Sequence, residues 1–110
     1  MSHSNNELLC HILDEVNYVL KACSGKTIDH LTEDETLKRA VIRSLEIIGE
    51  ASKKTDPDFR LMNPEIDWRG MMGTRDKLIH DYFGVNYNIV WDIVVNELPT
   101  LKQQLEEIIK

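Results

Sequence analysis

The sequence predicts an all-α protein, organised as a four-to-five-helix up-and-down bundle. Apolar residues recur at spacings of three and four along four long stretches, which is the period of amphipathic helices. No stretch shows the strict alternation of a half-buried strand, and no internal repeat is present. The length of 110 residues fits one domain, residues 1–110, and a composition of 42% hydrophobic and 29% charged residues is typical of a folded globular chain.

The first helix is expected to run from Ser4 to about Ser24. Ser4 and Glu7 fit a capping box, in which the two side chains bind the first free backbone amides. Gly25 then suits the left-handed residue that commonly follows the end of a helix. The predicted buried stripe comprises Leu8, Leu9, Ile12, Leu13, Val16, Leu20 and Cys23.

A second long helix is expected between a capping box at Thr32 and Glu35 and an end near Lys54. Its predicted buried line comprises Leu37, Val41, Leu45, Ile48 and Ser52. Another face carries Arg39, Arg43, Glu46 and Glu50. These charges either form solvated ion pairs within the helix or contribute to a polar interface, and the sequence alone leaves both readings open.

The third long helix is expected to begin at Asn63-Pro64, with the Asn as N-cap and the Pro at the first position. Its central part, Trp68 to Phe83, has a stripe of Trp68, Met71, Met72, Leu78, Ile79, Tyr82 and Phe83. Gly84 is expected to close it.

The last helix is expected to start at Asn86 or Asn88, either of which suits an N-cap. Its apolar register continues past Pro99, through Val90, Val94, Leu98, Leu101, Leu105 and Ile108. Because Pro cannot donate the backbone hydrogen bond, we expect a kink or a restarted helix near that residue.

Composition and charge exclude several classes of protein. The net charge of −6 argues against a protein that coats nucleic acid, which would be basic. No apolar run is long enough to span a membrane and no secretory signal is visible, so we expect a cytoplasmic protein without a membrane partner. Cys10 and Cys23 would lie about 20 Å apart on one helix, beyond disulfide reach. No cluster of metal ligands is apparent, and no metal or other cofactor is expected.

Two charged positions stand out in the third helix. Arg75 falls on the apolar stripe, where a permanent charge is costly unless an anion meets it. His80 follows Asp76 at the i, i+4 spacing, and the carboxylate would favour the protonated imidazole. Arg75 and His80 are about 140° apart around an ideal helix. Either the helix is irregular there, or a second copy in a two-fold dimer supplies half of the site.

The motif R-x-x-x-x-H-x-Y appears as R-D-K-L-I-H-D-Y at residues 75–82, with G-E-A upstream and Y-F-G-V-N-Y-N-I-V-W downstream. With these surroundings the chain resembles the HEPN superfamily, specifically its HepT-like branch. The resemblance covers nearly the whole chain. It implies a homodimeric helical bundle and a metal-independent endoribonuclease, the toxin of a toxin–antitoxin pair. It also implies a minimal nucleotidyltransferase as antitoxin, which adds AMP to the motif tyrosine, here Tyr82.

The resemblance assigns catalysis to Arg75, His80 and Tyr82, with Asp76 in support and RNA, not DNA, as substrate. Cleavage without metal uses the RNA 2′-hydroxyl as nucleophile and needs a proton acceptor, a proton donor and positive charge on the phosphate. A histidine and an arginine can supply these.

Two other interpretations remain. The chain could instead be a non-catalytic adaptor that presents substrate to a nucleotidyltransferase, or a plain helical dimerisation module. The dimerisation module leaves Arg75 unexplained. Each site residue also has a purely structural interpretation: Arg75 would pair with a carboxylate such as Glu46 or Glu50, His80 would be a surface histidine beside an acidic neighbour, and Tyr82 would be a core aromatic residue.

Overall fold

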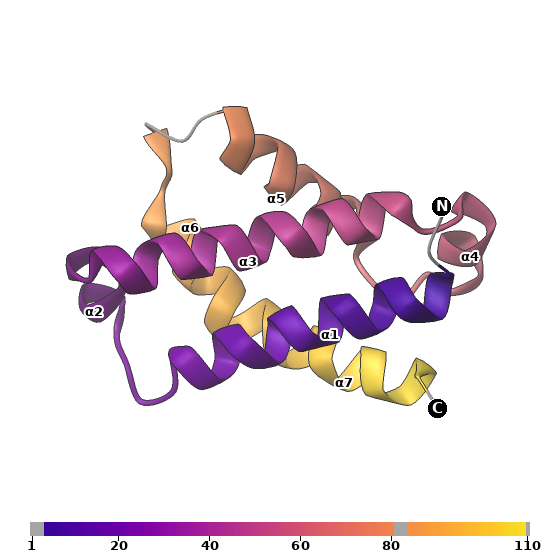
Figure 1. Ribbon diagram of the computed structural model, residues 1–110, viewed down its shortest axis with the longest axis horizontal. Coiled ribbons are helices and arrows are strands. Elements are labelled where there is room, and N and C mark those ends of the chain that lie inside the picture. Colours follow the sequence, from indigo (N-terminus) through magenta and orange to yellow (C-terminus); the bar gives the residue numbers. More distant parts are fainter. Residues whose placement is uncertain (1–3, 81–83, 110) are drawn as a thin grey trace.

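The fold is a bundle of four long helical segments, seen here in a computed structural model. The structure describes residues 4–80 and 84–109, and for residues 75–80 it describes the helical backbone alone. The four segments alternate in direction along the bundle, as Figure 1 shows. They are α1 (Asn5–Ala22), α3 (Glu35–Lys54), α5 (Trp68–His80) and the segment formed by α6 (Tyr87–Asp92), η2 (Ile93–Glu97) and α7 (Leu98–Ile108). The described residues contain no strand, and the predicted all-α class is confirmed.

Helix α1 begins and ends close to the predicted residues. The Ser4 hydroxyl accepts a hydrogen bond from the backbone N–H of Glu7 at 3.1 Å, and Gly25 has a positive φ of 72°. Cys23 is buried, which raises the pKa of its thiol, whereas Cys10 is half-buried; both thiols are free. The most deeply buried core side chains from α1 are Leu9, Ile12, Val16 and Val19.

Helix α3 has the predicted end at Lys54, but its N-cap is Asp34 and not Thr32. The Asp34 carboxylate accepts from the backbone N–H of Leu37 at 3.1 Å. Thr32 instead lies inside a short helix, α2 (Ile28–Glu33), whose N-terminus has a capping box formed by Thr27 and His30. All five residues of the predicted buried line of α3 are buried: Leu37, Val41, Leu45, Ile48 and Ser52.

The start of α5 also differs from the prediction at Asn63-Pro64. Asn63 ends another short helix, α4 (Pro57–Met62), and the chain then turns before α5 begins at Trp68. The N-cap is Asp67, whose carboxylate accepts from the backbone N–H of Gly70 at 3.0 Å. An Asn-Pro pair suits a helix start, but here the Asn side chain donates back to the carbonyl of Phe59 at 2.9 Å and completes α4.

The last segment is interrupted as expected from Pro99. Asn86 is the N-cap of α6, accepting from Asn88 N–H at 2.9 Å, and the interruption is a π-helical turn, η2, directly before α7. Pro99 then occupies the first turn of α7, where its missing N–H costs little. The apolar register survives the interruption, since Val90, Val94, Leu98, Leu101 and Leu105 are all buried, while Ile108 is half-buried.

Helix α3 is the central element of the bundle. It contacts α1 on one side and α5 on another, and α5 lies across α3 from α1 and α7 in Figure 1. Helix α5 therefore packs chiefly against one neighbour, whereas α1 packs against both α3 and α7. Among the described residues, no helix is long and apolar enough to cross a membrane.

Candidate active site

Three of the four predicted site residues lie on α5. Arg75, Asp76 and His80 fall in the part of α5 whose backbone is a regular α-helix. Asp76 and His80 are therefore one helical turn apart, and Arg75 is five positions before His80. Their side chains, and Tyr82 as a whole, lie outside the described residues. Their mutual contacts stay predictions.

The start of α5 is fixed by a buried aromatic residue. Trp68 is only 6% exposed, and its ring meets the ring of Phe59 edge-on, with 6.1 Å between the centroids. Its indole Nε1–H donates to the carbonyl of Asn63 at 2.9 Å. Because packing and a hydrogen bond both hold the first residue of α5, the helix that carries the motif leaves α4 in a defined direction.

Contacts with α3 then set the position of the middle of α5. The hydroxyl of Ser52, which is fully buried, donates to the carbonyl of Ile48 at 2.7 Å and lies 3.5 Å from the sulfur of Met71. One turn further, the Thr74 hydroxyl donates to the carbonyl of Gly70 at 2.8 Å. The residue directly before Arg75 is thus tied to its own helix, on a segment that is packed against α3.

A cavity of about 250 Å³ lies between α3, α5 and the η2–α7 segment. We call it the acidic cavity, because its lining includes Glu65, Asp67 and Glu97. Its apolar lining includes Leu45, Ile48, Met71, Leu98 and Leu101. Burial raises the pKa of Glu97, and the negative charges of Asp92 and Asp67 raise it further. A phosphate entering here would meet like charge, so this cavity does not suit RNA.

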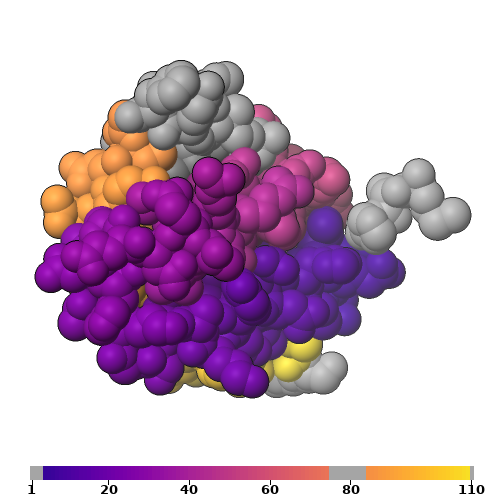
Figure 2. All heavy atoms as spheres, turned by 60° about the vertical axis from the view of Figure 1, so that its left-hand side comes forward, coloured from indigo at the N-terminus to yellow at the C-terminus, as the bar shows by residue number. Residues whose placement is uncertain are grey.

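A second depression, of about 390 Å³, lies where the first half of α3 meets the start of α6, on the face shown in Figure 2. We call it the basic groove, and its lining is Glu35, Lys38, Arg39, Ile42, Glu46, Val85 and Tyr87. The Glu35 carboxylate lies 3.0 Å from Lys38 Nζ and 3.7 Å from Arg39 Nε. The hydrogen bond and charge of Lys38, followed by Arg39, lower the pKa of Glu35.

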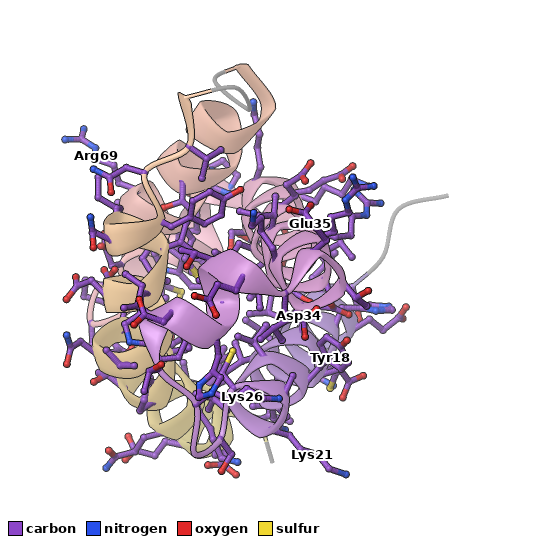
Figure 3. All side chains as sticks on the ribbon, turned by 90° about the vertical axis from the view of Figure 1, so that its left-hand side faces the viewer. Tyr18, Lys21, Lys26, Asp34, Glu35 and Arg69 are labelled. Atoms are coloured by element: carbon purple, nitrogen blue, oxygen red, sulfur yellow. The ribbon has the colours of Figure 1, made fainter. Side chains whose placement is uncertain are left out.

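The ammonium of Lys38 also lies over the ring of Tyr87, 5.2 Å from its centroid. Sequence reasoning missed this groove, because the contact joins residues that are distant in the chain. The signal that was present is the i, i+4 spacing of Glu35 and Arg39. In Figure 3, Glu35 lies on the side of the view where α3 begins, and Arg69 lies on the opposite side.

The polar face predicted on α3 is only partly paired. Glu50 binds Lys54, at 3.5 Å, and Arg39 binds Glu35. Arg43 is exposed and Glu46 is half-buried, and neither forms an ion pair with any residue that the structure describes. The two sequence interpretations of this face therefore stay open for Arg43 and Glu46, while Glu50 fits the solvated one. Within the described residues, no group of three or more His, Cys, Asp or Glu residues could hold a metal ion.

The comparisons with known proteins decide the family. The family model described as "Ribonuclease HepT-like" matches residues 12–108, which include α3, α5 and the whole motif. The chain belongs to the HepT-like ribonuclease family. The resemblance inferred from residues 75–82 is thereby confirmed.

The HepT-like chain is similar to several archaeal and bacterial proteins over nearly its whole length. A protein of Methanocaldococcus jannaschii named "Putative RNase" is 46% identical, covering 93% of this chain and 84% of the relative. One of Caldanaerobacter subterraneus with the same description is 43% identical, covering 91% and 89%. A "Probable ribonuclease HepT" of Thermococcus cleftensis is 39% identical across 100% of both chains. No solved structure gives a significant match.

Proposed function

We propose that this HepT-like chain is a metal-independent endoribonuclease, the toxin of a toxin–antitoxin pair. The observation that carries the proposal is the R-x-x-x-x-H-x-Y motif within a family match that spans residues 12–108. The names of the relatives support ribonuclease activity. The regular backbone of α5 supports the expected spacing of Arg75, Asp76 and His80.

The proposed chemistry is an internal transfer of the phosphodiester. The 2′-oxygen attacks the adjacent phosphorus as its proton passes to a base, and the P–O5′ bond breaks as an acid protonates the leaving oxygen. The products are a cyclic phosphate and a free 5′-hydroxyl. His80 is the proton-transfer group, Arg75 holds the charged phosphate with its planar fork of donors, and Tyr82 positions the phosphate.

We propose that two copies of the chain form the site. One histidine cannot be deprotonated base and protonated acid at the same moment, so a second His80 across a two-fold axis completes the pair. The spacing of about 140° between Arg75 and His80 on one helix is the physical reason for a second copy. Asp76, one turn before His80, would keep the imidazole oriented.

Neutralisation is proposed to occur at Tyr82. A nucleotidyltransferase antitoxin would transfer AMP from ATP to the phenolic oxygen, releasing pyrophosphate. The added group brings bulk and negative charge to a site that must accept an RNA phosphate, and like charges would then repel the substrate.

The test compares wild type with His80→Ala and with His11→Ala, a change at an exposed histidine on α1. Each protein is induced without a partner and is also purified and assayed on RNA in EDTA. We expect wild type and His11→Ala to arrest growth and cut RNA. His80→Ala should lose about 10²- to 10⁴-fold in cleavage rate, because it removes the proton-transfer group. Co-induction of the antitoxin should relieve arrest by wild type, and mass spectrometry should then find AMP on wild type and none on Tyr82→Phe.

Equal cleavage by wild type and a folded His80→Ala dimer would refute the catalytic assignment. If no protein cuts RNA while wild type still binds RNA and the nucleotidyltransferase, the chain is the non-catalytic adaptor instead. Cleavage that requires added metal would refute the metal-free mechanism alone.

A further inference from the structure

We propose that the basic groove is an RNA-binding subsite, in which Lys38 and Arg39 hold a phosphate next to the cleavage site. This inference rests on the proposed function for its substrate, but it concerns residues outside the motif. The groove is open at the surface, about 390 Å³ in volume, and is bordered by α3 on one side and by Val85 and Tyr87 on the other.

Two cations of the groove, Lys38 and Arg39, and a neighbouring one, Arg43, lie at the surface where a ligand can reach them. The Arg39 side chain is 83% exposed, and Arg43, one helical turn further along α3, is exposed and has no acidic partner among the described residues. Lys38 is more covered: its side chain is 19% exposed, and its ammonium lies over the Tyr87 ring and 3.0 Å from the Glu35 carboxylate. A lysine that is held in place loses less side-chain entropy when it binds an anion.

The groove is also close to the motif along the chain. Val85 is three residues after Tyr82, and three peptide units limit the distance between the two Cα atoms to about 11 Å. A strand whose scissile phosphate lies at the motif would therefore place a neighbouring phosphate within reach of the groove. Lys38, Arg39 and the neighbouring Arg43 face two carboxylates, Glu35 and Glu46, so this surface has an excess of positive charge in a chain of net charge −6 and attracts RNA locally.

Glu35 indicates how an anion would be bound. Its carboxylate oxygens already contact both Lys38 Nζ and Arg39 Nε, at 3.0 and 3.7 Å, so the two cations converge on one oxyanion. A phosphate oxygen is the same kind of ligand. The planar guanidinium of an arginine and the compact ammonium of a lysine are both suited to bind it. Glu35 is 67% exposed in its side chain and can rotate away, so it competes with the phosphate rather than blocking the groove.

The experiment measures binding and not cleavage. A fluorescent single-stranded RNA with 2′-O-methyl groups cannot be cut by the internal route, and its anisotropy is titrated with wild type in EDTA at several salt concentrations. Lys38→Gln/Arg39→Gln should weaken binding about tenfold and reduce the slope of log affinity against log salt by about 1.4, since each cation on a single strand contributes about 0.7. Wild type itself should show a shallow slope, of magnitude about 2, because three cations take part.

Two matched controls come from the other end of α3. Lys53→Gln/Lys54→Gln removes the same charge from the same helix, including one lysine that is paired with a glutamate. It should change affinity less than twofold. Glu35→Gln should strengthen RNA binding severalfold, since it removes the competing carboxylate, whereas Glu50→Gln, which frees Lys54, should not.

Failure of the groove and failure of the proposed function can be told apart. If the groove variants bind like wild type while wild type cuts RNA, the subsite is refuted and the ribonuclease stands. If they bind weakly and wild type cuts nothing, the subsite stands and the catalytic role falls. If the double variant changes the sedimentation mass of the protein instead of its RNA affinity, the groove is a protein contact and the proposal is overturned. Circular dichroism confirms that each variant is folded.

Discussion

Two of the depressions that helix α3 borders, the basic groove and the acidic cavity, have opposite character. Its first half lines the basic groove with Lys38 and Arg39, which are held by one exposed carboxylate. Its second half lines the acidic cavity with Leu45 and Ile48, which face an apolar wall. The basic groove is formed by charged side chains at the surface, whereas the acidic cavity adjoins the packed start of α5.

The difference indicates separate roles for the two regions. Side chains around the acidic cavity hold α5 in place, so changes there should alter the free energy of unfolding. The basic groove is lined by exposed or half-buried side chains whose ion pairs lie at the surface and contribute little to stability, so changes there should alter binding. The net acidity of the chain does not by itself argue against the proposed RNA subsite, because Glu65, Asp67 and Glu97 line the acidic cavity and not the basic groove.

The largest effect is expected at Trp68. Trp68→Ala removes a buried indole, its edge contact with Phe59 and its hydrogen bond to Asn63, and should lower the free energy of unfolding by about 3–5 kcal/mol. Urea denaturation at a fixed protein concentration measures this. Tyr87→Ala, at the half-buried aromatic residue of the basic groove, should cost less than half as much. Equal losses would contradict the division into a structural and a binding region.

Much of the fold could be predicted from the sequence, because the helices pack through apolar residues that recur with the period of an α-helix. The buried lines of α1, α3 and α7 follow from apolar spacing alone, and the structure buries most of the residues so assigned. The errors are at helix starts. Thr32 and Asn63 match local capping patterns, yet Asp34 and Asp67 are the caps that the structure uses. Local patterns offer several caps, and packing selects one.

The candidate site likewise has a part that could be predicted from the sequence and a part that could not. The motif on α5 is visible in the sequence because its residues are close together in the chain. The contact of Lys38 with Tyr87 is not, because it joins helices separated by about half of the chain, and only the fold brings them together.

A middle-sized effect is expected at two glycines of α5. No described atom lies within 4 Å of a Cβ added at Gly73, so Gly73→Ala should raise the free energy of unfolding by about 0.5–1 kcal/mol through helix propensity. A Cβ on Gly70 would instead lie 2.7 Å from Cγ of Asp67 and displace the cap of α5. Gly70→Ala should therefore lose about 1 kcal/mol relative to Gly73→Ala.

The same two glycine changes can be made in a protein that also carries Asp67→Ala. That protein lacks the carboxylate that the new Cβ at position 70 would meet. There, Gly70→Ala should stabilise α5 much as Gly73→Ala does. Thermal unfolding followed by circular dichroism gives the four free energies of the cycle. A Gly70→Ala change that stabilises the wild-type background equally would show that Asp67 is not the cap that matters.

The smallest effect is expected at Glu97, at the edge of the acidic cavity. Burial and the charges of Asp92 and Asp67 raise the pKa of this carboxyl, so the folded state binds its proton more readily than the unfolded state does. Stability contributed by that proton is present at low pH and is lost as pH rises through the raised pKa. Glu97→Gln should therefore stabilise the protein at pH 7, by less than about 0.5 kcal/mol because this carboxyl is only partly covered and water screens its charge, and the gain should vanish below about pH 4. Denaturation curves of wild type and Glu97→Gln at both pH values measure the gain in the free energy of unfolding. The control is Glu107→Gln, at an exposed glutamate. A gain that is independent of pH would mean that repulsion between carboxylates does not act at this cavity.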